Sequence, residues 1–224
     1  MLAYIIRRVA QSILVLLVVG LVAFSMFRFV GDPIDNMLGQ ERTQEDIDRL
    51  RSDLGLDQPF PVQYFKFLGG AAQGNFGVSY RQGRPVSTII AERAPATLEL
   101  AAVSGFLALT IGIGLGVFTA IRRDGWASNI IMSVSLIGVS LPTFLIGILL
   151  IYLFSVELDM LPSFGRGEVV DLGWWTTGFL TESGLKALIL PSITLGLYQM
   201  TLIMRLVRSE MLEVLRQDYI RFAR

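Results

Sequence analysis

The sequence predicts an all-α membrane protein: a polytopic helical bundle with four membrane helices and a small external helical cap. Four stretches contain no charged residue, namely residues 9–27, 100–121, 125–156 and 187–204. A helix crosses the hydrocarbon core of a bilayer with about 20 apolar residues, and in lipid its backbone groups must pair with one another. The composition agrees, because 53% of residues are hydrophobic and 17% are charged, whereas soluble domains have about 25% charged residues.

The composition also excludes several kinds of function. The formal net charge is +0, so the basic surface typical of nucleic-acid binding is not expected. The chain has no cysteine, which excludes disulfides and thiolate metal sites. It has no histidine, and histidine is the commonest general base and metal ligand. We therefore expect no catalytic residue, no metal site and no nucleic-acid partner.

Basic residues predict the orientation of the helices, because lysine and arginine collect on the cytoplasmic side of a membrane. Arg7 and Arg8 precede the first uncharged stretch, Arg122 and Arg123 follow the second, and five arginines follow the fourth. We expect a multi-pass protein with a cytoplasmic N-terminus. The expected segments are cytoplasmic residues 1–8, membrane helices at 9–30, 98–121, 128–156 and 187–207, external regions at 31–97 and 157–186, a cytoplasmic turn at 122–127, and a cytoplasmic segment at 208–224.

Two features inside the uncharged stretches attract attention. Gly112 and Gly116 are four residues apart, a spacing that is typical of a close helix-packing face in membranes. Pro142 removes a helical hydrogen bond and predicts a kink, and Ser140 and Thr143 beside it are able to satisfy the freed backbone groups. The kink is either purely structural or a hinge or pore-lining bend, and the sequence leaves both interpretations open.

The first external region is expected to be ordered. Helices are predicted over residues 43–55 and over residues 61–68, the second ended by Gly69-Gly70. This region is interpreted as a helical cap on the membrane helices, as a docking surface for an external partner, or as both. In the second external region Trp174 and Trp175 are adjacent, which is typical of an interfacial anchor.

The last twenty residues have a different character. From Arg205 onward, charged residues alternate with apolar ones at helical spacing. One interpretation is an amphipathic helix that lies on the inner leaflet against membrane lipid. The other is a docking helix for a cytoplasmic protein.

Several short motifs occur along the whole chain in a specific order. They are Gly31-Asp32-Pro33, Leu54-Gly55-Leu56-Asp57-Gln58-Pro59, Gly74-Asn75-Phe76-Gly77-Val78-Ser79, Arg93-Ala94-Pro95-Ala96-Thr97-Leu98-Glu99-Leu100, Ser140-Leu141-Pro142-Thr143-Phe144, Leu190-Pro191-Ser192, and the segment from Met211 to Arg224. With these motifs the chain resembles the membrane permease subunit of binding-protein-dependent ABC importers, in the oligopeptide/dipeptide branch. The last motif resembles the start of the cytoplasmic coupling loop of that family.

This resemblance implies a role and a set of partners. The coupling loop fits the ATPase subunit, and the residues implied for coupling are Glu213, Arg216, Asp218, Tyr219 and Ala223. The implied partners are a second permease subunit, two ATP-binding cassette ATPase subunits and an external solute-binding protein. The implied location of the chain is the cell inner membrane. No cofactor is expected on this chain, and ATP-Mg is expected on the partner subunits. The family carries two further membrane helices, so the chain is expected to be C-terminally truncated.

The substrate and two rival functions stay open. Peptides are the default cargo of this branch, while glutathione, nickel chelates and some sugars are carried by related permeases. A channel or secondary transporter would usually carry Asp, Glu, Lys or Arg inside its spans, and the uncharged stretches here have none of these. A membrane anchor or assembly protein without a transport role is the other alternative. Dependence of uptake on ATP hydrolysis separates these functions.

Overall fold

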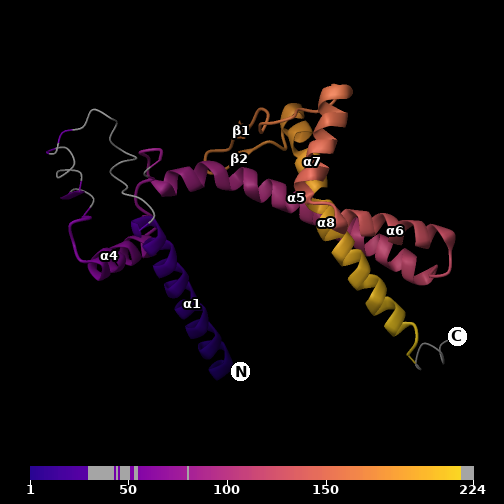
Figure 1. Cartoon of the computed structure of the whole chain (residues 1–224), viewed down its shortest axis with the longest axis horizontal. Coiled ribbons are helices and arrows are strands. Elements are labelled where there is room, and N and C mark those ends of the chain that lie inside the picture. Colours follow the sequence, from indigo (N-terminus) through magenta and orange to yellow (C-terminus); the bar gives the residue numbers. More distant parts are fainter. Residues whose placement is uncertain (30–42, 44, 46–50, 53–54, 80, 218–224) are drawn as a thin grey trace. The chain divides into compact units, whose positions relative to one another are not determined.

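The computed structural model describes residues 1–29, 43, 45, 51–52, 55–79 and 81–217 (Figure 1). The chain divides into two compact units, Met1–Glu92 and Arg93–Arg224, which we call unit 1 and unit 2. The helix predicted over residues 43–55 lies almost entirely outside the described residues. The described elements are α1 (Leu2–Phe29), α4 (Phe60–Ala72), α5 (Val86–Ile121), α6 (Trp126–Ser140), α7 (Thr143–Ile151), a π-helical turn η1 (Tyr152–Glu157), β1 (Val170–Asp171), β2 (Thr176–Thr177) and α8 (Glu182–Val214).

Unit 1 is held together by aromatic contacts between α1 and α4. The ring of Phe24 on α1 lies 5.5 Å from Phe60, 5.9 Å from Tyr64 and 5.6 Å from Phe67, measured between ring centroids. Tyr64 is buried and donates its hydroxyl to the backbone carbonyl of Leu17 over 2.6 Å. A buried tyrosine usually finds such a partner for its hydroxyl, so this bond aligns α4 on an otherwise apolar helix.

Helix α4 continues past the point where the sequence predicted its end. The prediction ended the helix at Gly69-Gly70, whereas α4 includes both glycines and ends at Ala72. An added Cβ at Gly70 would lie 2.9 Å from the carbonyl oxygen of Asn75. Gly70 is therefore explained by the close approach of the chain after the helix, and not by a stop signal.

Unit 2 is organised around α8, which contacts α5, α6 and α7. The approach of α5 to α8 is closest at two glycines of α5. A Cβ added to Gly112 would lie 2.9 Å from the carbonyl oxygen of Met200, and one added to Gly116 would lie 2.8 Å from that of Met204. Real Cβ atoms do not occupy such positions, so the two backbones meet only because both residues lack a side chain. This geometry is the small-residue packing that membrane helices use in place of a hydrophobic driving force.

The contacts of α8 with α6 and α7 follow the same rule. An added Cβ would lie 3.2 Å from Thr201 Oγ1 at Gly138 of α6, and 3.3 Å from Thr194 Cγ2 at Gly147 of α7. Thr201 and Thr194 donate their own hydroxyls to carbonyls one turn earlier in α8. Their polar atoms are thus satisfied within the helix, and their small side chains leave room for the neighbours.

Three of the described helices are long and apolar enough to cross a membrane. They are α1, α5 and α8, whose most apolar parts have mean hydropathies of 2.4, 2.1 and 1.6. The remaining apolar length is divided between α6 and the α7–η1 segment, which are shorter. The four spans of the sequence prediction therefore correspond to three long helices and one interrupted segment in the part of the chain that the structure describes.

The interruption lies at Pro142. The sequence predicted a kink within one helix over residues 128–156, but α6 ends at Ser140 and α7 begins at Thr143. Pro142 has a ψ of 135°, which is extended backbone. Proline supplies no N–H and disfavours helical backbone at the residue before it, so the helix stops and a new one starts. Figure 1 shows α6 and α7 running in different directions from this point.

Other boundaries also differ from the prediction. Helix α5 begins at Val86 and continues through Pro95, so residues assigned to the external region extend the second membrane helix. Helix α8 continues to Val214, seven residues beyond the predicted end at 207. The strands β1 and β2 form a short antiparallel pair that the all-α prediction did not include. Their two-residue length explains why no alternating pattern signalled them.

The close crossing of α5 and α8 can be tested with alanine. We expect Gly116→Ala to lower the free energy of unfolding by about 1–3 kcal/mol, because the new Cβ overpacks a backbone contact. Gly114→Ala is the matched control, since nothing lies within 4 Å of an added Cβ there. Unfolding in mixed detergent micelles measures both, and equal stability of the two variants would contradict the crossing.

Candidate functional site

A buried and hydrogen-bonded polar group of unit 2 is the carboxylate of Glu99 on α5, which is 3% exposed. It accepts hydrogen bonds from Arg166 Nη2 at 3.1 Å, Trp175 Nε1 at 3.2 Å and the backbone N–H of Gly178 at 3.3 Å. All three donors belong to the segment between η1 and α8. A buried charge is tolerated when it is paired and hydrogen-bonded, and these contacts meet that condition. We call Glu99, Arg166, Trp175 and Gly178 the Glu99 cluster.

The short β1–β2 pair places the donors of the Glu99 cluster. Gly173 has a φ of +88° in the turn, and its N–H is bound by Asp171 Oδ1 at 2.7 Å. The turn reverses the chain so that Trp175 reaches the carboxylate. Arg166 also donates from Nη1 to Thr176 Oγ1 at 2.8 Å, which holds the guanidinium plane beside the hairpin. One carboxylate therefore fastens the whole segment to α5.

The geometry indicates that the Glu99 cluster stabilises the fold. Protein donors bind both carboxylate oxygens of a side chain that is 3% exposed, so the charge of Glu99 is satisfied within the protein. Trp175 donates its indole N–H inside the cluster, whereas Trp174 is 84% exposed. Interfacial anchoring stays a prediction for both tryptophans.

Sequence reasoning missed the Glu99 cluster as a unit. Glu99 is the last charged residue before the uncharged stretch 100–121, and Arg166 is one of two basic residues in an acidic external region. These two charged residues were the features of the sequence that pointed to the Glu99 cluster. No pattern in the sequence joined them, because they lie 67 residues apart.

The candidate residues around Pro142 lie on the surface of unit 2. Ser140 donates its hydroxyl to the carbonyl of Leu136 at 2.8 Å, which is a bond to the preceding turn of α6. The Pro142 carbonyl accepts the N–H of Leu145 at 3.0 Å and begins α7. Ser140, Pro142 and Thr143 are exposed. The structure thus brings these three residues together at the junction of two helices.

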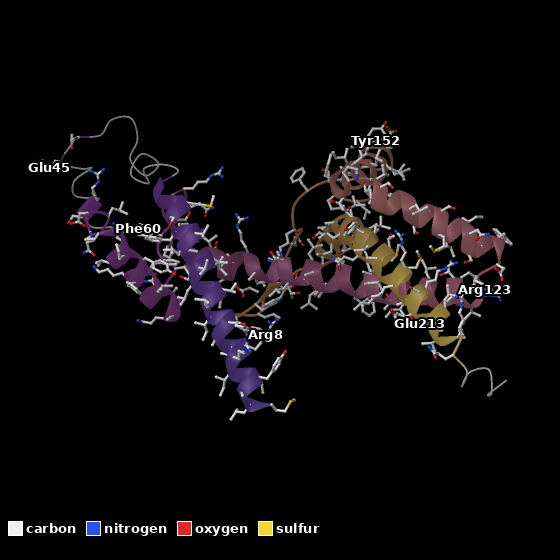
Figure 2. The ribbon with its side chains drawn as sticks, turned by 60° about the horizontal axis from the view of Figure 1, so that its bottom comes forward. Arg8, Glu45, Phe60, Arg123, Tyr152 and Glu213 are labelled. Atoms are coloured by element: carbon white, nitrogen blue, oxygen red, sulfur yellow. The ribbon has the colours of Figure 1, made fainter. Side chains whose placement is uncertain are left out.

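The candidate coupling residues are only partly described. Glu213 lies in the last turn of α8 and Arg216 follows its end, and both are exposed. Asp218, Tyr219 and Ala223 lie outside the described residues. Figure 2 shows Glu213 near the end of α8 and Arg123 in the turn between α5 and α6, both at one end of unit 2. In the part of the chain that the structure describes, no group of three or more metal-binding side chains comes together.

Two family models match the chain. Residues 1–101 match the N-terminal region of the binding-protein-dependent transport system membrane component, and residues 112–224 match the binding-protein-dependent transport system inner membrane component. The chain belongs to this family of permeases. The first match ends just beyond Glu99, and the second begins at Gly112 and includes α6, α7, α8 and the candidate coupling residues.

Curated relatives of the permease agree over its whole length. A putative peptide transport system permease protein of Brucella abortus is 41% identical over 227 residues, which covers 100% of this chain and 69% of the relative. The dipeptide transport system permease protein of Alkalihalophilus pseudofirmus is 36% identical over 234 residues, with 99% and 70% covered. A probable peptide ABC transporter permease protein of Sinorhizobium fredii is 35% identical over 222 residues, with 98% and 68% covered.

The permease is a multi-pass membrane protein of the binding-protein-dependent ABC transport family. Its apolar helices α1, α5 and α8 agree with this assignment. The chain spans about 70% of the length of the curated relatives that it matches. Its family performs transport, and the bonded carboxylate of Glu99 is consistent with a supporting role in the permease.

The Glu99 cluster predicts a strong effect of a neutral substitution. We expect Glu99→Gln to lower the free energy of unfolding by about 3–5 kcal/mol, because it leaves the guanidinium of Arg166 without its buried partner. Glu182→Gln is the matched control. Glu182 pairs with Lys186 at 2.7 Å, but its side chain is 84% exposed, and exposed pairs contribute little. Unfolding in detergent measures the stability of both variants. A Glu99→Gln protein as stable as the control would contradict a stabilising role of the Glu99 cluster.

Proposed function

We propose that this permease is the membrane-spanning subunit of an ATP-driven ABC importer of the cell inner membrane. In this role it forms half of the translocation pathway for peptides that an external binding protein delivers. The observation that carries the proposal is 35–41% identity, over 98–100% of this chain, to proteins named as peptide or dipeptide permeases. Oligopeptides and dipeptides are the proposed substrates, with glutathione, nickel chelates and sugars as the other cargoes to be tested.

The long helix α8 gives this proposal a physical basis. It has 33 residues, which corresponds to about 50 Å, whereas the hydrocarbon core is about 30 Å thick. Helix α8 is therefore long enough to run from the external segment to Glu213, the first of the candidate coupling residues. A shift of its inner end moves residues throughout the span, because a helix transmits displacement along its axis.

The proposed orientation places the N-terminus in the cytoplasm. Arg7 and Arg8 lie near the start of α1, and Arg122 and Arg123 lie in the turn after α5, so both positions fit the cytoplasmic side. The Glu99 cluster then lies on the outer side. The sequence contains no G-x-x-x-x-G-K-[ST] motif, with which phosphate-binding loops hold nucleotides. We assign ATP-Mg to two partner ATPases, beside a second permease subunit.

Reconstitution tests the proposed function. The permease is purified from its native membranes in mild detergent, its partners are identified by mass spectrometry, and peptide uptake is measured in proteoliposomes. We expect a second permease and two ATPases to copurify, and we expect uptake to require both ATP and the external binding protein. Uptake that an ion gradient drives without ATP would show a secondary transporter. A chain that purifies alone and supports no uptake would show an anchor or assembly protein.

The candidate coupling residues predict a specific loss. We expect Asp218→Arg combined with Tyr219→Ala to lower ATP-driven uptake by about tenfold or more, because a reversed charge at a subunit contact is unfavourable. ATP hydrolysis by the ATPase subunits should continue. Asp57→Arg is the control, since Asp57 is an exposed carboxylate outside the coupling segment. Uptake by the double variant equal to that of the control would contradict the assignment.

The break at Pro142 is proposed as a hinge of the pathway, with Ser140 and Thr143 as its polar neighbours. We expect Pro142→Ala to let α6 and α7 join, and to lower uptake by about fivefold or more by favouring one conformation. Pro162→Ala, in an exposed part of the external segment, is the control. Assembly is measured by copurification of the ATPases. Unchanged uptake in Pro142→Ala would show that the break is only structural.

A further inference from the structure

Arg208, in the inner part of α8, has an unusual environment for a charged residue. It is half-buried, and among the described residues no carboxylate forms a salt bridge with it. Its Nη1 donates to the hydroxyl of Ser128 at 3.0 Å. Ser128 is fully buried, so the guanidinium of the half-buried Arg208 reaches a buried hydroxyl group.

The hydroxyl of Ser128 also forms a hydrogen bond with a third helix, α5. While it accepts the bond from Arg208, it donates to the backbone carbonyl of Thr119 at 3.2 Å. Ser128 lies in the first turn of α6, and Thr119 lies in the last turn of α5. The end of α5, the start of α6 and the distant helix α8 therefore meet at one hydroxyl group, which we call the Ser128 bridge.

The end of α5 explains why a cation is stable here although no carboxylate among the described residues pairs with it. Carbonyls in the last turn of a helix lack their normal intrahelical partners, and the helix dipole makes that end partially negative. The Ser128 hydroxyl satisfies one such carbonyl, and the guanidinium lies next to the hydroxyl. Two other arginines nearby are engaged elsewhere, since Arg123 contacts Asp124 at 3.3 Å and Arg122 lies 5.4 Å over the ring of Phe118.

The position of Arg208 along α8 connects it to the candidate coupling residues. Arg208 precedes Glu213 by five residues of continuous helix, which is about 7.5 Å along the axis. On its other side, Val207 lies against Gly116, where an added Cβ would be 2.8 Å from Val207 Cβ. The inner end of α8 is thus packed against α5 without spare volume, and a polar link holds it to the α5–α6 turn.

We propose that Arg208 and Ser128 are positioning residues that make the inner end of α8 and the α5–α6 turn move as one body. A displacement of the coupling segment by the ATPase then reaches α5 and α6 as well as α8. Without the Ser128 bridge, the coupling segment moves while the α5–α6 turn lags behind, so ATP hydrolysis is less tightly coupled to transport. This inference rests on the proposed function, because it presumes that an ATPase engages the segment after Arg208.

The ratio of transported solute to hydrolysed ATP tests the proposal. Arg208→Met removes the donor but keeps the apolar stem, and Ser128→Ala removes the hydroxyl. Each is expected to lower the ratio by about threefold to tenfold, as for one hydrogen bond between membrane helices. The double variant should be no worse than either single variant, because both remove the same interaction. Arg208→Lys, which keeps a charged donor, should restore much of the ratio.

Two matched control variants distinguish loss of the Ser128 bridge from a general effect of substituting residues in these helices. Arg205→Met removes an exposed arginine one turn earlier in α8, and Ser133→Ala removes an exposed serine of α6. Both should keep the parental ratio. Ratios in Arg208→Met and Ser128→Ala equal to those of the controls would overturn the proposal. A loss of uptake fully explained by a smaller amount of assembled transporter would also overturn it, because the role would then be structural only.

A distance measurement gives a second readout that does not depend on uptake. The chain has no cysteine, so spin labels can be attached to cysteines introduced at Asn129 and Ser209, both of which are exposed. The distance between the labels should be narrow and unchanged with and without nucleotide in the parent protein. It should broaden in Arg208→Met. A parental distance that changes with nucleotide would refute movement as one body, whereas failure of ATP-dependent uptake in the unmodified transporter would refute the proposed function instead.

Discussion

The arrangement of unit 2 depends on how closely α5 approaches α8. At Gly112 and Gly116 the backbones meet with no space for a Cβ atom. In lipid the hydrophobic effect does not favour one apolar helix partner over another. Close van der Waals packing therefore determines which helices pair. Once α5 and α8 cross at this place, the positions of α6 and α7 follow, because both pack on α8 through glycines of their own.

Polar contacts at the two ends of this crossing help to determine the register of the packed helices. At one end the Glu99 cluster fastens the segment between η1 and α8 to α5. At the other end the Ser128 bridge joins α8 to the α5–α6 turn. Polar groups buried beside lipid are unfavourable when unpaired, so each contact favours one register of the helices. The middle of the crossing is held by shape and its ends by hydrogen bonds.

For a permease this division matters, because transport needs a part that stays rigid and a part that yields. We propose that the tightly packed α5–α8 crossing is the rigid part in unit 2. The junction at Pro142 is the place where the backbone leaves the helical conformation, so reorientation of α7 relative to α6 would break no helical hydrogen bond there. Alternating access by movement of rigid bodies about such junctions is a general way to expose a site to two sides in turn.

The sequence by itself determined the membrane character, the mainly helical class and the family, because hydropathy and charge distribution act locally along the chain. Proline also acts locally and predicted a kink at Pro142, but the structure ends one helix there and begins another. The sequence also indicated Gly112 and Gly116 as a packing face, although not the helix that they face. Only the tertiary structure decided that Glu99 meets Arg166, that Ser128 meets Arg208, and that two short strands lie before α8. These pairs lie 67 and 80 residues apart. Their contacts arise from the crossing of helices, and no local pattern encodes which distant residues a crossing brings together.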